Sequence, residues 1–139
     1  MARTIGVYLY PETSDGINRR GDNRSQTINR DLERLYYMYD RSIRETPLEV
    51  GEACLLVDCL NGSPTDPRSA GLLWASVEDS IALEGLDKKW GVDGQKLVGK
   101  IKNMNILQQM ALVDAAERFW AKSEAWESTE AGARECFNV

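Results

Sequence analysis

Apolar and polar residues alternate strictly near the start of the chain. One side of the alternation carries Ile5, Val7 and Leu9, and the other carries Thr4, Gly6 and Tyr8. A period of two predicts a β-strand over residues 3–9, which Pro11 ends. Only helical spacing follows this strand. The backbone donors and acceptors of the strand therefore need a partner strand from outside the chain. A second copy of the chain is the simplest source, and the pattern therefore predicts a homodimer.

The apolar spacing changes to that of an α-helix at Asn23. The apolar stripe consists of Ile28, Leu32, Leu35, Tyr36, Tyr39 and Ile43. Asn23 or Ser25 can cap this helix, which we expect to end near Arg44. Residues 12–22 contain Ile17 as their one apolar side chain and predict at most a short helix.

Four further helices are predicted in residues 46–122. Thr46, Pro47 and Glu49 suggest a cap, a first-turn proline and a capping box. The later start signals are Thr65 or Asp66 with Pro67, then Asp93, then Asn105, and the stop signals are Asn61 and Gly85. We expect these helices to bury Trp74, Trp90 and Trp120 together. Residues 123–139 are polar and predict a loose tail.

Composition places the chain among ordinary globular proteins. Of its 139 residues, 42% are hydrophobic and 28% are charged, which argues against a disordered or collagen-like chain. Mean hydropathy is −0.43, and no stretch has the ~20 apolar residues of a membrane span. The first residues lack the apolar segment of a signal peptide, so we expect a cytoplasmic protein without a membrane partner.

Charge is distributed unevenly along the sequence. Residues 1–45 carry eight Arg and seven acidic residues, a net charge of +1, whereas the other 94 residues carry nine basic and fifteen acidic residues, a net charge of −6. All Lys residues lie in the second part. An Arg-only set suits planar hydrogen bonding to phosphate or carboxylate, although a solvated helix face of mixed charge explains the composition equally well.

Residues that could support catalysis or metal binding are sparse. The chain has no His, and its three cysteines (Cys54, Cys59 and Cys136) lack Cys-x-x-Cys spacing, which favours reduced core cysteines over a zinc site. The carboxylate pairs are Glu78 with Asp79, Glu84 with Asp87, and Glu127 with Glu130, and we interpret them as outward-facing. No phosphate-binding glycine loop or nucleophile elbow occurs. We therefore expect no enzyme activity, no metal and no cofactor.

The helix start after the strand reads Asn23-Arg24-Ser25-Gln26-Thr27-Ile28-Asn29-Arg30-Asp31-Leu32. Together with the strand, it resembles the ribbon-helix-helix family of DNA-binding dimers, over residues 2–44. The resemblance implies that two strands pair across the dimer axis and enter the major groove of double-stranded DNA. It places Thr4, Gly6 and Tyr8 toward the base edges and Arg3, Asn23, Arg24 and Ser25 at phosphates. The implied dimer core is Ile5, Val7, Leu9, Ile28, Leu32 and Leu35.

The sequence thus predicts a mainly α-helical protein in three parts. These are a ribbon-helix-helix arm over residues 1–45, a helical body over 46–122 and a polar tail over 123–139. The body is similar to regions of uncharacterised bacterial and mobile-element proteins, and its acidity suggests a protein partner. The first hypothesis is a homodimeric DNA-binding regulator, either a repressor or an antitoxin-like protein. The alternative is an acidic phage or mobile-element inhibitor of a nucleic-acid-handling machine, similar to an anti-CRISPR, that uses the arm only to dimerise.

The sequence Tyr36-Tyr37-Met38-Tyr39 has two interpretations. At helical spacing, Tyr36, Met38 and Tyr39 are typical of core and dimer packing. A surface on which nucleic-acid bases stack is the alternative, and we favour packing.

Overall fold

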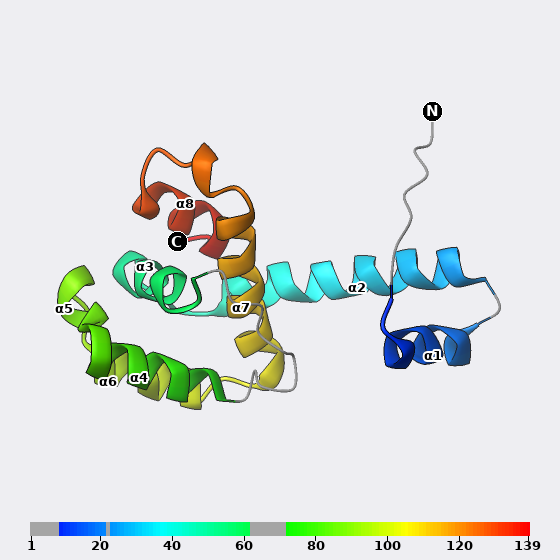
Figure 1. Cartoon of the computed structure of the whole chain (residues 1–139), viewed down its shortest axis with the longest axis horizontal. Helices are drawn as coiled ribbons and strands as arrows, with labels where there is room; N and C mark the ends of the chain where they lie inside the picture. Colours follow the sequence, from blue (N-terminus) through cyan, green and yellow to red (C-terminus); the bar gives the residue numbers. More distant parts are fainter. Residues whose placement is uncertain (1–8, 22, 62–71) are drawn as a thin grey trace. The chain divides into compact units, whose positions relative to one another are not determined.

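The computed structural model describes residues 9–21, 23–61 and 72–139, and the regular structure within these ranges is helical (Figure 1). The helices are α1 (Pro11–Arg20), α2 (Arg24–Glu45), α3 (Val50–Cys59), α4 (Leu73–Glu84), α5 (Leu86–Trp90), α6 (Gly94–Lys102), α7 (Ile106–Ala121), the 3-10 turn η2 (Ser123–Ala125) and α8 (Thr129–Phe137). The expectation of a mainly α-helical protein is confirmed. The predicted strand over 3–9 lies outside the described residues except for Leu9, as does the helix start predicted at 65–67.

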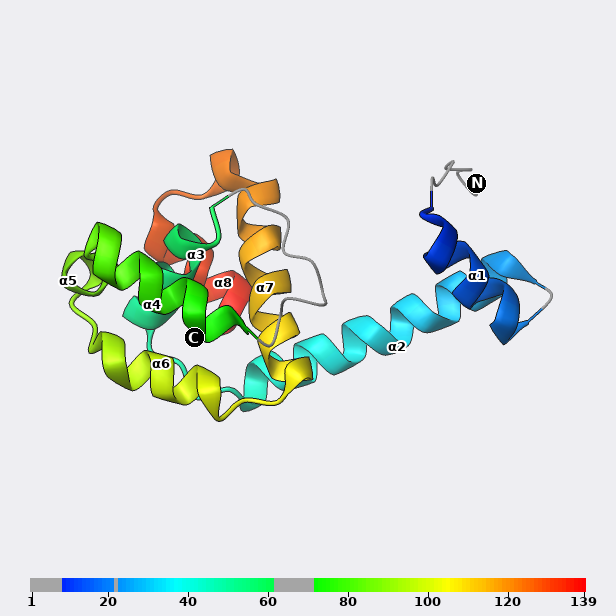
Figure 2. The same ribbon diagram turned by 60° about the horizontal axis from the view of Figure 1, so that its bottom comes forward.

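The chain divides into two compact units, Met1–Tyr37 and Met38–Val139, and α2 contributes residues to both. In the first unit, α1 lies beside the first half of α2, as two views agree (Figures 1 and 2). Among the residues described in this unit, Ile17 on α1 and Thr27 on α2 are buried, at 9% and 3% exposure. Residues 12–22 were expected to hold at most a short helix, and α1 has ten residues.

The second unit is organised around α3. Its residues 52–57 are all 2% exposed or less, and α3 packs against α8, α7 and α5. Helices α4 and α6 pack side by side in the same unit. The largest fully buried apolar side chains are Phe137, Leu55, Leu56, Leu97, Ile101 and Leu112. Burial of an aliphatic core from many helices is the main term that stabilises such a unit.

Several predicted helix ends are confirmed. The Asp93 side chain accepts a hydrogen bond from the Lys96 backbone N–H at 3.1 Å and begins α6. Asn105 and Gln108 form a reciprocal capping box at the start of α7. Gly85 ends α4 with φ of 63°, a left-handed conformation that costs glycine little. Side-chain caps therefore fix these boundaries locally, as the sequence indicated.

The predicted start of the first body helix at Thr46 was wrong by three residues. Glu49 is the N-cap of α3, and its capping-box partner is Glu52. Thr46 instead closes α2, because its hydroxyl donates to the Ser42 carbonyl oxygen at 2.6 Å. Its side chain therefore satisfies an orphan carbonyl at a helix C-terminus rather than amides at an N-terminus.

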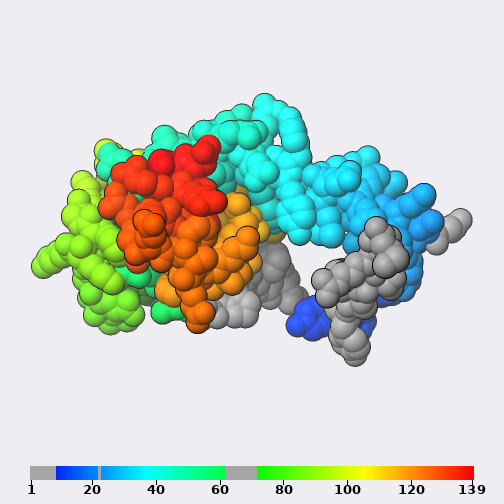
Figure 3. Space-filling model, turned by 90° about the horizontal axis from the view of Figure 1, so that it is seen from above, coloured from blue at the N-terminus to red at the C-terminus, as the bar shows by residue number. Residues whose placement is uncertain are grey.

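The expectation of a loose tail over 123–139 was also wrong. This segment contains η2 and α8, and α8 packs on α3 and α7. In the space-filling view the orange and red atoms of this segment lie directly against the rest of the second unit (Figure 3). Ala133, Cys136 and Phe137 are buried, at 0%, 6% and 1% exposure. Three apolar residues on one face are enough to anchor a nine-residue helix whose overall composition is polar.

The three tryptophans expected to be buried together do not form the core. Trp74, Trp90 and Trp120 are each half-buried. The indole N–H of Trp90 donates to Asp58 at 2.8 Å, and that of Trp120 donates to the Val57 carbonyl oxygen at 2.9 Å. An indole must satisfy its N–H, which favours positions at the rim of an aliphatic core.

Candidate nucleic-acid interface at the start of α2

Two polar contacts link α1 to α2. Arg20 Nη1 and Asp31 Oδ2 form an ion pair at 2.6 Å, and Arg24 Nη2 donates to Ser14 Oγ at 3.0 Å. The first contact joins the last turn of α1 to the second turn of α2, and the second joins the start of α2 to the middle of α1. Together with the buried Ile17 and Thr27, these contacts orient the first turn of α2.

Asn23 caps this first turn. Its Oδ1 accepts from the Gln26 backbone N–H at 3.0 Å, and its carbonyl oxygen accepts from the Thr27 N–H at 3.0 Å. Arg24 and Ser25 lie in the first turn with exposed side chains, and no acidic residue lies there. The N-terminus of a helix carries a partial positive charge and unpaired N–H groups. This turn therefore combines the features that hold a phosphate.

Cations also surround Asp31, one turn further along. The hydrogen bond from Arg20, with the charges of Arg20, Arg30 and Arg34, lowers the pKa of the Asp31 carboxyl below its ordinary value of 3.8. Asp31 therefore stays ionised at neutral pH and holds Arg20 to α2. The ionised Asp31 carboxylate therefore stabilises the fold at pH values above its ordinary pKa, and this stabilisation is lost as the pH falls through its lowered pKa.

The residues expected in the dimer core are incompletely covered. Ile28 and Leu35 are half-buried, while Leu32 is 39% and Tyr36 is 53% exposed. Further along the same stripe, Tyr39 and Ile43 are buried, at 7% and 5% exposure. The packing interpretation of Tyr36, Met38 and Tyr39 therefore holds for Tyr39, whereas Tyr36 and Met38 are exposed within the chain, at 53% and 40%.

Part of the expected interface lies outside the described residues. This part comprises Arg3, Thr4, Ile5, Gly6, Val7 and Tyr8. Leu9 is half-buried just before α1. The structure places Asn23, Arg24 and Ser25 together in one helical turn. Local spacing carries no signal for the contacts of Ser14 and Arg20, because these depend on how α1 folds back along α2.

The three cysteines are protonated thiols, and the six carboxylates paired in the sequence lie mostly in water. Burial raises the pKa of the Cys54 thiol to about 11, and burial also raises the pKa of Cys59 and of Cys136. These thiols are protonated at neutral pH, as expected for core residues rather than nucleophiles. Five of the six paired carboxylates are exposed, and Asp87 is half-buried. Within the described ranges, His, Cys, Asp and Glu form no cluster that could hold a metal ion.

Comparison of the chain with protein-family models, curated proteins and solved structures found no match. In the part of the chain that the structure describes, no helix has the length and apolar character required to cross a membrane.

Proposed function

We propose that the protein is a homodimeric, double-stranded DNA-binding regulator whose first unit holds phosphate at the start of α2. The observation that carries this proposal is the Asn23-capped turn with its exposed Arg24 and Ser25. An Arg side chain and helix amides at one point can bind a phosphate oxygen together, because charge and hydrogen bonds act on the same group.

The uncovered apolar stripe supports the dimer. The described chain leaves 39% of Leu32 and 53% of Tyr36 exposed. A second copy would bury this surface by placing α2 beside its own counterpart, with the strands predicted over 3–9 paired across the axis. In this arrangement two copies of the Arg24 turn flank a pair of strands that enters the major groove.

The difference in net charge between the two units is consistent with a regulator that binds a protein as well as DNA. The unit up to Tyr37 has a net charge of +1, and the unit from Met38 has a net charge of −6. Contact with DNA therefore falls to the first unit, and the acidic second unit is suited to a basic protein partner. An acidic inhibitor that uses the arm only to dimerise remains the second candidate, because the same negative charge supports it.

Replacing Arg24 with Ala tests the phosphate contact. We would titrate a fluorescein-labelled duplex from upstream of the protein's own gene, with a scrambled duplex, at several salt concentrations. Each lost phosphate contact reduces the slope of log K against log salt by about 1. We expect Arg24→Ala to lower the affinity of the protein for both duplexes and to reduce the salt slope by about 1.

The matched control is Lys96→Ala, since Lys96 is an exposed cation on α6 in the acidic unit. We expect its affinity and salt slope to equal those of the wild type. Equal losses in the two variants would show a general charge effect and would remove Arg24 from the interface. A folded wild-type protein that binds neither duplex would favour the inhibitor.

A further inference from the structure

Helix α4 lies at the surface of the second unit, although apolar residues occur on all of its sides. It packs against α6, α3 and α5, and in Figure 1 it runs beside α6 along the lower edge of the unit. Seven of its twelve residues are apolar, namely Leu73, Trp74, Ala75, Val77, Ile81, Ala82 and Leu83. Of these, Leu73 and Val77 alone are buried. Because a helix that is apolar all round is normally enclosed by protein, the outer side of α4 is suited to a partner.

This outer side carries a leucine at each end. Leu83 is 85% exposed, and Leu72, the N-cap residue of α4, is 60% exposed. Eleven positions separate them, which corresponds to three helical turns and about 16 Å, so both lie on the same side of the helix. Trp74 lies half a turn away from Leu83, and Lys102 Nζ of α6 is 4.4 Å from the centroid of its ring. The two leucines therefore lie on the side of α4 opposite to that cation.

A small residue and two acidic residues accompany the leucines. Ser76 and Asp79 continue the spacing from Leu72 to Leu83 at intervals of four, three and four residues, and both are exposed, as is Glu78. We call these five residues the α4 face. Ion pairs in the described part of the second unit involve other acidic residues, namely Glu45, Glu52, Asp58, Asp114 and Glu130. Within the described ranges, Glu78 and Asp79 therefore form no ion pair.

The position of Asp79 restricts what can cover the α4 face. A purely apolar surface placed on both leucines would bury the Asp79 carboxylate without a partner, which costs free energy. A second copy of α4 would bring further acidic residues, because this helix contains no Lys or Arg, and like charges in an interface oppose binding. The covering surface must therefore combine apolar side chains for the leucines with cations for Glu78 and Asp79. A basic amphipathic helix has this combination.

We propose that the α4 face binds a basic, amphipathic α-helix of a partner protein. Leu72 and Leu83 pack on the apolar side of that helix, and Glu78 and Asp79 pair with its Lys or Arg residues. The three turns between the leucines correspond to about 11 residues of the partner helix. This inference rests on the part of the proposed function that gives the acidic second unit a basic protein partner, and it does not depend on DNA binding by the first unit.

The test uses the full-length protein and a fluorescein-labelled peptide of Leu and Lys, about 14 residues long, or roughly four helical turns. Its leucines recur at helical spacing, so the peptide forms an amphipathic basic helix. A second peptide has the same composition in an order without an apolar side, and a third has Glu in place of every Lys. Fluorescence anisotropy at several salt concentrations measures the affinity of each peptide.

Leu83→Ser tests the apolar contact. We expect this variant to bind the Leu/Lys peptide about tenfold more weakly or worse, because it loses the burial of one leucine side chain. The matched control is Ile106→Ser, since Ile106 begins α7 and is 54% exposed. We expect the control to bind as the wild type does. Circular dichroism and thermal unfolding verify that both variants are folded.

The double variant Glu78→Gln with Asp79→Asn tests the charged contact. We expect it to bind the Leu/Lys peptide about tenfold more weakly at low salt and to depend less on salt, because two ion pairs are lost. The matched control is Glu117→Gln with Glu135→Gln, which removes the same charge from exposed positions on α7 and α8. We expect this control to retain the affinity and salt dependence of the wild type.

Several results would overturn the proposal. These are equal losses in a variant and its matched control, equal binding of all three peptides, or a folded wild-type protein that leaves the Leu/Lys peptide unbound. Sedimentation velocity covers the other occupant, since a homodimer that dissociates in Leu83→Ser would assign the α4 face to a second copy. Peptide and duplex binding are measured separately. A protein that binds the duplex but not the peptide refutes this inference alone, and the reverse result refutes DNA binding alone.

Discussion

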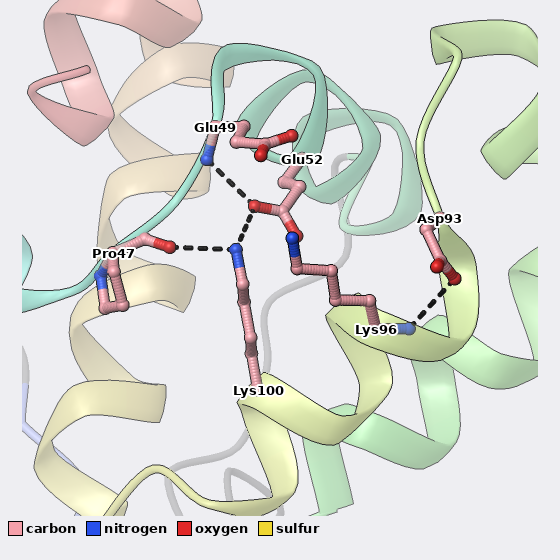
Figure 4. A network of polar contacts seen from close by, with 6 residues as sticks. All are labelled: Pro47, Glu49, Glu52, Asp93, Lys96 and Lys100. Carbon is pink, nitrogen blue, oxygen red and sulfur yellow. Dashed lines mark hydrogen bonds and ion pairs between the residues drawn. The ribbon is translucent and has the colours of Figure 1, made fainter.

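At the scale of single residues, Glu52 is a carboxylate inside the core of the second unit. It is 1% exposed, and its Oε1 accepts from Lys100 Nζ at 2.6 Å and from the Glu49 backbone N–H at 2.8 Å (Figure 4). Lys100 Nζ also donates to the Pro47 carbonyl oxygen at 3.0 Å. One ion pair therefore ties α6 to the start of α3 and to the segment before it.

Lys100→Met should lower the free energy of unfolding by about 3 kcal/mol, because it leaves the buried Glu52 carboxylate without a counter-ion. Lys96→Met on the same helix is the control, since Lys96 is exposed, and its effect should stay within about 0.5 kcal/mol. Urea denaturation followed by circular dichroism measures both. Equal stabilities of the two variants would show that the pair contributes little.

Residue patterns predicted some of these roles and missed others. Asn23, Asp93 and Asn105 were recognisable as caps because a cap acts on amides two or three residues ahead. The Glu52–Lys100 pair joins residues 48 positions apart, and no local pattern indicates such a contact. The helix α2 was predicted to within one or two residues, whereas the strand over 3–9 stays a prediction.

At the scale of elements, the packing of α8 depends on the absence of a side chain at Gly132. A Cβ there would lie 2.4 Å from Phe119 Cε2 and 2.6 Å from Trp126 Cγ. Phe119 and Trp126 stack with ring centroids 6.0 Å apart, and the Trp126 indole N–H donates to the Phe119 carbonyl oxygen at 3.0 Å. The segment after α7 thus folds back through an aromatic pair that only glycine accommodates.

We expect Gly132→Ala to destabilise the protein by about 1–3 kcal/mol through overpacking, despite the better helix propensity of alanine. Gly99→Ala on α6 is the matched control, because a Cβ there meets nothing within 4 Å. That variant should be stabilised by about 0.5–1 kcal/mol. Thermal unfolding of both variants checks the difference, and a stabilised Gly132→Ala would contradict the observed packing of α8.

The error over residues 123–139 has a physical cause. The apolar residues of α8 are few, and Phe137 is the one large side chain among them, so the composition of α8 indicates a polar tail. Its anchorage comes from contacts with the preceding helix α7 and with α3, which lies about 70 residues earlier in the sequence. Composition reports the average over all faces of a helix, and α8 is stabilised by one face.

At the scale of the whole molecule, the two units differ in net charge, because Arg slightly outnumbers the acidic residues up to Tyr37 and acidic residues outnumber Lys and Arg from Met38 on. The first unit presents the Asn23-capped turn and the uncovered Leu32 and Tyr36, and the second contributes the net charge of −6. This division is visible in the sequence as a shift in composition. The contacts of Arg20 with Asp31 and of Arg24 with Ser14 are not visible there, because they join residues eleven and ten positions apart on two different helices.

The central claim is that two copies of the chain bind one duplex through the start of α2. Sedimentation velocity of a fluorescein-labelled duplex from upstream of the gene, at saturating protein and low salt, tests it most directly. We expect the complex to contain the duplex and two chains of 15.6 kDa each, and to dissociate steeply as salt rises. A complex with a single chain, or a folded dimer that leaves the duplex unbound, would contradict the account.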